Sequence, residues 1–96
     1  MANWNLRSGY GQEELKAAAW KNASPLLGTS EMRLDCDGRY INWSEYGKTS
    51  AFGWQIDHII PVSLGGSDVP SNVRARHYLG NTSAGGILGA LLNAKR

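Results

Sequence analysis

The residues best suited to chemistry lie in the second half of the chain: the pair Asp57-His58, followed by Asn72 and Asn81. A histidine can act as a general base near neutral pH. Carboxylate and amide oxygens are hard ligands, of the kind that Mg²⁺ and Mn²⁺ prefer. These residue types could therefore activate a water molecule beside a bound divalent cation. The pair Asp57-His58 by itself is a weak signal, because adjacent residues of a strand face opposite sides and such a pair is more often structural.

Two short strands and a helix are predicted to position these residues. Residues 54–60 alternate along the chain and are rich in β-branched and aromatic side chains, which predicts a strand. Residues 63–72 are rich in Gly, Ser, Asp and Pro, which predicts a loop. Residues 73–76 are expected to form a second short strand. A helix is expected to begin near residue 77 or 78 and to carry Asn81.

The first half of the chain is predicted to supply a helix and a strand that pack around this unit. Residues 12–22 contain good helix formers, with acidic residues at the start and a basic residue at the end, which suits the helix dipole. The turn signal Asp37-Gly38 precedes a short strand over residues 39–43. Residues 26–38 show no pattern that assigns them to an element. A last helix is expected over residues 87–94.

The composition suits one small globular domain over residues 1–96. Hydrophobic residues make up 42% and charged residues 19%, which argues against a disordered chain. No stretch of about 20 apolar residues is present, so no membrane-spanning helix and no membrane partner are expected. The first residues lack the apolar core of a signal peptide, and the single cysteine, Cys36, cannot form an internal disulfide. A cytoplasmic location is therefore the default expectation.

The positive charge of the chain is concentrated toward its C-terminal third. The formal net charge is +2, and no Asp or Glu follows Asn72. That third contains Arg74, Arg76, Lys95 and Arg96. A polyanion such as a nucleic acid would suit this charge, although an ordinary solvated face would show the same residues. Arg74 and Arg76 alternate on one strand and so share a face, which makes them the candidates for binding the phosphates of a nucleic acid.

The linked pattern over residues 52–82 resembles the HNH endonucleases, also called ββα-metal nucleases. It contains the run WQIDHIIPVSLGGSD, with one Asn fourteen residues after His58 and a second Asn nine residues later. The resemblance implies that His58 is the general base and that Asn72 accepts the Nδ1 proton of its imidazole, which leaves Nε2 to take a proton from water. It also implies that Asp57 and Asn81 are ligands of one divalent ion, Mg²⁺ or Mn²⁺.

The resemblance implies a fold of the α+β class. The HNH core and its strand lead-in would occupy residues 39–83, with an arm and helix before them over residues 1–35 and a tail over residues 84–96. The implied activity is that of a metal-dependent endonuclease that hydrolyses phosphodiester bonds in DNA. RNA as the substrate and an inhibitory or assembly protein as a partner stay open. The alternative is a catalytically weak or inactive module that keeps the HNH fold and binds nucleic acid or assembles with a partner.

Two features depart from the family pattern. Many HNH proteins hold a structural zinc with two Cys-x-x-Cys pairs, but here Cys36 and His77 stand at those places, paired with Arg39 and Gly80. Two ligands are fewer than a structural zinc takes, so no such zinc is expected, and His77 is predicted to be packed or hydrogen-bonded. Gly85 stands where many members carry a Lys or His as a third metal ligand. An aromatic cluster is expected to supply stability by burial; it comprises Trp20, Tyr40, Trp43, Tyr46 and Trp54.

Overall fold

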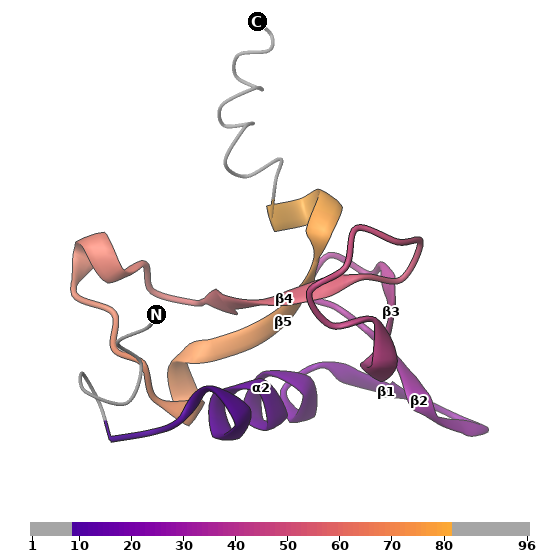
Figure 1. Ribbon diagram of the computed structural model, residues 1–96, viewed down its shortest axis with the longest axis horizontal. Coiled ribbons are helices and arrows are strands. Elements are labelled where there is room, and N and C mark those ends of the chain that lie inside the picture. Colours follow the sequence, from indigo (N-terminus) through magenta and orange to yellow (C-terminus); the bar gives the residue numbers. More distant parts are fainter. Residues whose placement is uncertain (1–8, 82–96) are drawn as a thin grey trace, which may run out of the picture.

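One α-helix and two small antiparallel sheets make up residues 9–81, the part of the chain that the structure, a computed structural model, describes (Figure 1). The helix is α2 (Gln12–Lys21). The first sheet has the strand order β1-β2-β3, formed by β1 (Ser24–Leu26), β2 (Thr29–Leu34) and β3 (Tyr40–Asn42). The second sheet, which we call the β4–β5 ribbon, pairs β4 (Trp54–His58) with β5 (Val73–His77). The fold is thus of the expected α+β class.

Short helical turns connect these elements. Three of them are 3₁₀ turns: η1 (Trp43–Glu45), η2 (Val62–Leu64) and η3 (Pro70–Asn72). Residues 78–81 are helical directly after β5, where the helix that carries Asn81 was expected. The helix expected over residues 87–94 lies outside the described residues. Between residues 9 and 81, no helix has the length and apolar character needed to cross a membrane.

Helix α2 agrees with the predicted range to within one residue. The Gly11 N–H donates to Glu14 Oε1 over 2.8 Å, which satisfies one of the main-chain donors at the start of the helix. Leu15 and Ala19 are four residues apart, so they lie on one face of the helix, and both are fully buried. The helix packs against β5 and β4, and it thereby supports the ribbon that carries the predicted site residues.

The hairpin of β1 and β2 occupies residues that show no pattern in the sequence. The two strands pair antiparallel, with Ser24 opposite Leu34, and Gly28 at φ +85° lies in the tight turn between them. The tip of the hairpin is exposed, and Leu27 there is fully accessible to solvent. A strand pair that buries so little needs no alternation of apolar and polar side chains, so the usual strand signal is missing. The strand predicted over residues 39–43 is confirmed in its central part, β3.

The antiparallel pairing of β4 with β5 sets the register of the predicted site. The pairs include Trp54 with His77, Asp57 with Arg74, and His58 with Val73. Strand β5 is one residue longer than predicted, whereas β4 ends at His58, two residues before the predicted end. The reason is local: the N–H and C=O groups of Ile60 bond to the side chain of Asn72 instead of to a neighbouring strand.

The core joins the helix, the ribbon and the first sheet around one indole. Trp54 is fully buried, and its Nε1–H donates to the Asn42 C=O over 2.9 Å. Three rings surround it with centroids 4.9 to 5.9 Å away, those of Trp20, Trp43 and Tyr46. Four members of the predicted aromatic cluster therefore pack together. The prediction for Tyr40 is wrong, because this side chain is 55% exposed.

Candidate functional site

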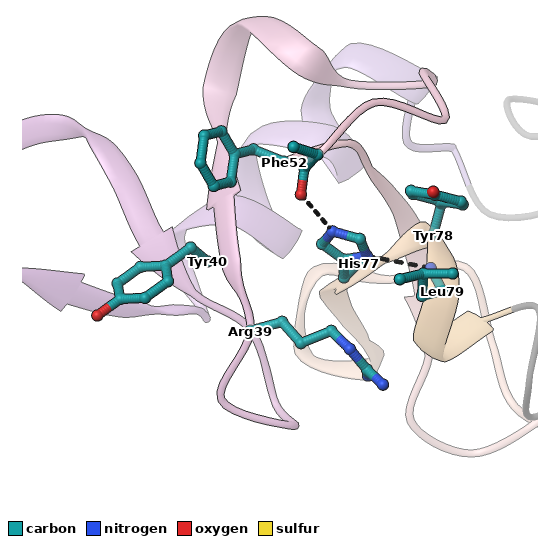
Figure 2. A pocket seen from close by; sticks show the side chains of 7 residues that line it. Arg39, Tyr40, Phe52, His77, Tyr78 and Leu79 are labelled. Atoms are coloured by element: carbon teal, nitrogen blue, oxygen red, sulfur yellow. Dashed lines mark hydrogen bonds between the residues drawn. The ribbon is translucent and has the colours of Figure 1, made fainter.

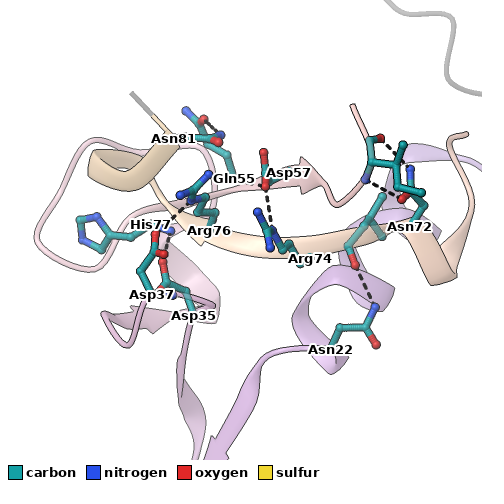
Figure 3. Close-up of polar contacts among 12 residues, drawn as sticks. Asn22, Asp35, Asp37, Gln55, Asp57, Asn72, Arg74, Arg76, His77 and Asn81 are labelled. Carbon is teal, nitrogen blue, oxygen red and sulfur yellow. Dashed lines mark hydrogen bonds and ion pairs between the residues drawn. The ribbon is translucent and has the colours of Figure 1, made fainter. Parts of the chain in front are cut away.

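One face of the β4–β5 ribbon is polar and carries most of the predicted site residues. Residues directly opposite each other in an antiparallel pair share a face, so Asp57 lies beside Arg74, and Gln55 beside Arg76. Asn81 joins this face from the helical turn 78–81, as Figure 3 shows. We call this set the polar face: Gln55, Asp57, Arg74, Arg76 and Asn81.

The carboxylate of Asp57 contacts two guanidinium groups. Arg74 Nε donates to Asp57 Oδ2 over 2.8 Å, and Arg76 Nη1 lies 3.8 Å from the same oxygen. Partial burial lowers the pKa of Arg74, but the hydrogen bond to Asp57 and the neighbouring acidic groups outweigh burial, so this pKa lies above its ordinary value. The two arginines predicted to bind phosphate and the acidic residue predicted to bind metal are therefore paired with one another.

Asn81 reaches the polar face through Gln55. Its Nδ2 donates to Gln55 Oε1 over 2.7 Å, and Gln55 precedes Asp57 by two residues on the same face of β4. The two predicted metal ligands, Asp57 and Asn81, therefore lie on one face. Their donor set fits Mg²⁺ or Mn²⁺, because it offers a carboxylate oxygen and an amide Oδ1 and leaves other positions to water or phosphate. Both arginine contacts are to Asp57 Oδ2, so an ion would share that oxygen with Arg74 or bind through Oδ1.

His58 contacts the loop that follows β4 rather than the polar face. As the neighbour of Asp57 in the strand, it belongs to the opposite face. Its Nε2 lies 2.6 Å from Asp68 Oδ1, and the side chains of His58 and Asp68 are 18% and 2% exposed. The prediction that Nε2 is left for water is wrong, because a buried carboxylate engages this nitrogen. Asp68 ends the run WQIDHIIPVSLGGSD of the sequence pattern, but that pattern assigns it no role at the site.

Asn72 closes the loop between the strands and does not contact the imidazole. Its Oδ1 accepts the Ile60 N–H over 2.9 Å, and its Nδ2 donates to the C=O groups of Ile60 and Ser67 over 3.1 and 3.0 Å (Figure 3). The side chain is buried, so these main-chain groups need a partner within the protein. The predicted role of Asn72 as acceptor of the His58 Nδ1 proton is therefore wrong. A side-chain amide supplies an acceptor for the one N–H group and a donor for the two carbonyl groups, which is the physical reason for an asparagine here.

The two loop glycines allow this closure for different reasons. Gly65 has φ +92°, in the left-handed region that favours glycine. Gly66 passes so close to the base of the loop that a Cβ atom there would stand 1.7 Å from the Ile60 carbonyl oxygen and 2.9 Å from Asn72 Nδ2. The Gly-Gly pair of the sequence pattern thus serves the geometry of the Asn72 contacts.

Helix α2 also supports the loop, through the residue that caps its C-terminus. Asn22 Nδ2 donates to the Pro70 C=O over 3.1 Å and to the Val73 C=O over 2.9 Å; Figure 3 draws one of these two bonds. These two carbonyl groups flank Asn72 along the chain. The helix therefore fixes the point at which the loop enters β5, and Asn22 is a supporting residue that the sequence pattern does not mark.

The second histidine, His77, has a structural role. It is 3% exposed, its Nε2 lies 2.7 Å from the Ala51 C=O, and the Leu79 N–H donates to its Nδ1 over 3.1 Å. A carbonyl accepts and an N–H donates, so these contacts require the proton on Nε2 and the lone pair on Nδ1. The main-chain N–H of His77 donates to Asp35 Oδ2 over 2.8 Å. The predicted packed and hydrogen-bonded role of His77 is confirmed.

Asp35, Cys36 and Asp37 form an acidic cluster after β2, with ligand atoms within 4.8 Å of one another. Both carboxylates have partners: Asp35 Oδ1 accepts two N–H groups of the following turn, and Asp37 Oδ2 pairs with Arg76 Nε at 3.1 Å. Partial burial raises the pKa of the Cys36 thiol above its ordinary value, and Arg74 offsets this only in part. Contacts within the protein account for the cluster, so we leave it out of the candidate site.

The predicted site residues fall into two groups. Asp57 and Asn81 share the polar face with both arginines, as the predicted strands require. His58 and Asn72 lie at the loop end of the ribbon, where Asp68 rather than Asn72 contacts the imidazole. Comparisons of the chain with family models, with curated proteins and with solved structures find no match.

Proposed function

We propose that the chain is a metal-dependent endonuclease of the HNH type that hydrolyses phosphodiester bonds in DNA. The observation that supports this most is the order of elements at the site: an antiparallel ribbon joined by a Gly-Gly loop and followed at once by the helical turn 78–81. Asp57 and Asn81 lie on one face of that unit, and His58 ends its first strand. The same residues make up the sequence pattern that resembles HNH nucleases, so both observations support one function.

In this proposal Asp57 and Asn81 hold one divalent ion, Mg²⁺ or Mn²⁺. When bound, the ion supplies positive charge that offsets the phosphate and stabilises the leaving oxygen. Arg74 pairs with Asp57 Oδ2, so the ion would share this oxygen with Arg74 or bind through Oδ1. A substrate phosphate gives that guanidinium another anionic partner, which it can bind through two parallel hydrogen bonds. Arg74 and Arg76 would then hold the backbone of the substrate.

His58 acts as the general base in this proposal. The Asp68 carboxylate accepts the Nε2 proton, so the neutral imidazole carries its lone pair on Nδ1. Nδ1 takes a proton from the water that attacks phosphorus, and the negative charge of Asp68 stabilises the imidazolium that results. Because His58 is the last residue of β4, a phosphate across the end of this strand can reach both the imidazole and the polar face.

Cleavage of supercoiled plasmid DNA in Mg²⁺ or Mn²⁺ tests the proposal. The substitution His58→Ala should lower the cleavage rate at least about 100-fold, a usual contribution of a general base. Thr49→Ala, in the exposed segment before β4, is the control and should cleave at the wild-type rate. Thermal melting checks that both variants are folded. Equal cleavage by the wild type and His58→Ala would reject the catalytic assignment.

An inactive nucleic-acid-binding or assembly module is the second candidate. The Asp57–Arg74 ion pair favours it, because this pair neutralises the carboxylate that a metal ion needs. Such a module would bind DNA without divalent ions, and its binding would survive His58→Ala. A titration with Mn²⁺ followed by the melting temperature separates the candidates, since a ligand that binds the folded state raises this temperature. A rise supports the nuclease, and no change at millimolar Mn²⁺ supports the module.

A further inference from the structure

A pocket of about 300 Å³ opens at the end of the ribbon where His77 lies. Figure 2 shows Tyr40 and Phe52 on one side of it and Tyr78 and Leu79 on the other. Tyr40, Phe52 and Leu79 are 55%, 41% and 47% exposed. Large apolar side chains that surround a hollow at such exposure are typical of a binding site rather than of a core.

The pocket is lined largely by aromatic side chains and is held in place by main-chain contacts. Both nitrogens of His77 bond to main-chain groups, and its imidazole stacks on Tyr78 with ring centroids 4.9 Å apart and planes at 28°. The Asn42 N–H donates to the Phe52 C=O over 3.1 Å. The Tyr78 N–H donates to the Gly53 C=O over 3.0 Å. The pocket is therefore preformed, and it suits a flat ring better than a charged group.

A row of guanidinium groups leads from the pocket to the candidate metal ligands. Arg39 lines the pocket, and its Nη1 lies 3.5 Å from Asp37 Oδ2. Arg76 Nε lies 3.1 Å from the same oxygen, and Arg76 Nη1 lies 3.8 Å from Asp57 Oδ2. Together with Arg74, three guanidinium groups lie beside three carboxylates, because Asp35 adjoins Asp37. Asp35 is buried and bonds main-chain N–H groups, so the exposed part of the path presents guanidinium donors that can bind phosphate oxygens.

The helical turn 78–81 connects the pocket with the polar face. A Cβ atom at Gly80 would stand 2.9 Å from Asp37 Oδ2 and 3.0 Å from Arg39 Nη1, so the turn lies directly against these ion pairs. The same turn carries Tyr78 at the pocket and Asn81 on the polar face. A ligand that occupies both the pocket and the polar face needs a flat ring and an anionic group in one molecule. A nucleotide has this chemistry.

We propose that the pocket receives one unstacked nucleobase of a DNA strand whose phosphates run along Arg39 and Arg76 toward Asp57. This inference rests on the proposed nuclease function and narrows its substrate to DNA with an unpaired base beside the cut. A base inside a duplex is stacked and paired, so it must leave the stack to enter such a pocket. Ring faces bind any base, so the pocket selects single-stranded DNA without reading its sequence.

Fluorescence anisotropy of labelled DNA tests whether the pocket binds an unstacked base. The assay contains EDTA, so no divalent ion supports cleavage and binding alone is measured. The labelled probes are a thymidine strand of about 12 nucleotides, an abasic strand of equal length and a duplex. Phe52→Leu keeps an apolar side chain but removes the ring, so it should weaken binding of the thymidine strand about tenfold. It should leave binding of the abasic strand unchanged. Phe52→Tyr restores a ring and should restore binding, whereas Arg76→Gln should weaken binding of both strands.

Equal affinity of the wild type and a folded Phe52→Leu variant for the thymidine strand would overturn the proposal, and so would an equal loss on the abasic strand. A labelled Trp-containing peptide serves as a further probe. If a ligand that binds beside Phe52 displaces this peptide but does not displace the thymidine strand, the proposal is overturned in favour of a protein partner. The assay needs neither metal nor His58. If plasmid cleavage rejects the nuclease function, base-dependent binding in EDTA can still be observed. If the anisotropy assay rejects the pocket, the plasmid cleavage result still stands.

Discussion

The two ends of the β4–β5 ribbon each carry a histidine, and the surroundings of the two rings differ. His77 is buried and gives both ring nitrogens to main-chain groups. His58 places Nε2 against the Asp68 carboxylate and keeps 18% of its side chain exposed. The His77 ring is therefore held between main-chain groups, whereas the His58 ring is backed by a carboxylate at the end of a strand. The partners and the exposure of the ring, rather than the residue type, therefore distinguish the histidine that we propose as a base from the one that supports the fold.

At both ends of the β4–β5 ribbon, one polar side chain bonds three main-chain groups. Asn72 bonds one N–H and two carbonyl groups of the loop at one end. Asp35 accepts three main-chain N–H groups at the other end. We call these two side chains the clamps. The Asp57 contacts of the polar face lie between the two clamps along the ribbon.

The largest effect is expected from Asp68→Asn, which tests whether the Asp68 carboxylate supports His58 as the proposed general base. The substitution keeps the size of the side chain but removes the negative charge that would stabilise an imidazolium, so plasmid cleavage should slow at least about 100-fold. Glu31→Gln makes the same chemical change at an exposed position of β2 and is the matched control. Thermal melting reports whether both variants fold. Wild-type cleavage by Asp68→Asn would mean that this carboxylate only holds the loop.

The clamps are expected to give the next largest effect, on stability. Asn72→Ala and Asp35→Ala each leave three main-chain groups without their partner, and we expect each to lower the free energy of unfolding by about 3 kcal/mol. Asp35→Ala should lose more, because hydrogen bonds to a charged acceptor are stronger. Urea denaturation measures both, with Ser63→Ala in the exposed loop as the control. If either clamp variant unfolds at the wild-type midpoint, its contacts do not hold that end of the ribbon.

A smaller effect is expected between the clamps, at the Asp57 carboxylate. Arg74→Gln removes the guanidinium at 2.8 Å and should tighten Mn²⁺ binding, whereas Arg76→Gln removes the one at 3.8 Å and should change it less. Both ion pairs are partly exposed, so solvent screening limits the gain to about 1 kcal/mol, or about fivefold in affinity. Calorimetric titration of the folded variants measures it. Weaker Mn²⁺ binding by Arg74→Gln would contradict competition for the carboxylate.

The smallest effect concerns Cys36, near the His77 end. Partial burial raises its pKa, so the folded protein holds less thiolate at a given pH than the unfolded chain. Alkylation by iodoacetamide at about pH 8 should be a few-fold slower in the folded protein than in urea. The raised pKa also contributes stability that is complete below the ordinary value of 9.0 and is lost as the pH rises through the folded value. Equal alkylation rates in both states would show that the fold does not protect the thiol.

Much of the fold is predictable from the sequence wherever an element buries one face. Leu15 and Ala19 give α2 its buried stripe, and the alternation that begins at Trp54 marks β4. The β1–β2 hairpin is not predictable in this way, because its side chains are largely exposed and carry no period. The early end of β4 depends on the contact of Ile60 with a side chain that is distant in sequence, which no local pattern encodes.

The same division holds within the candidate site. Strand alternation is enough to place Arg74 and Arg76 on the face of Asp57, because the period of two fixes it. The partners of Asn72 and His58 depend on which groups of an irregular loop lack a strand partner. Residue types do not reveal this, so the sequence pattern predicts a contact between Asn72 and the imidazole and gives no role to the Asp68 carboxylate.

The aromatic core gives the chain a spectroscopic property of its own. The indoles of Trp20, Trp43 and Trp54 lie with ring centroids 5.3 to 5.9 Å apart. Electronic transitions of chromophores at such separations couple, so the folded protein should show an exciton couplet in its ultraviolet circular dichroism. Trp54 belongs to the strand that also bears the proposed base and ligand, so this couplet reports the integrity of that strand without any added label.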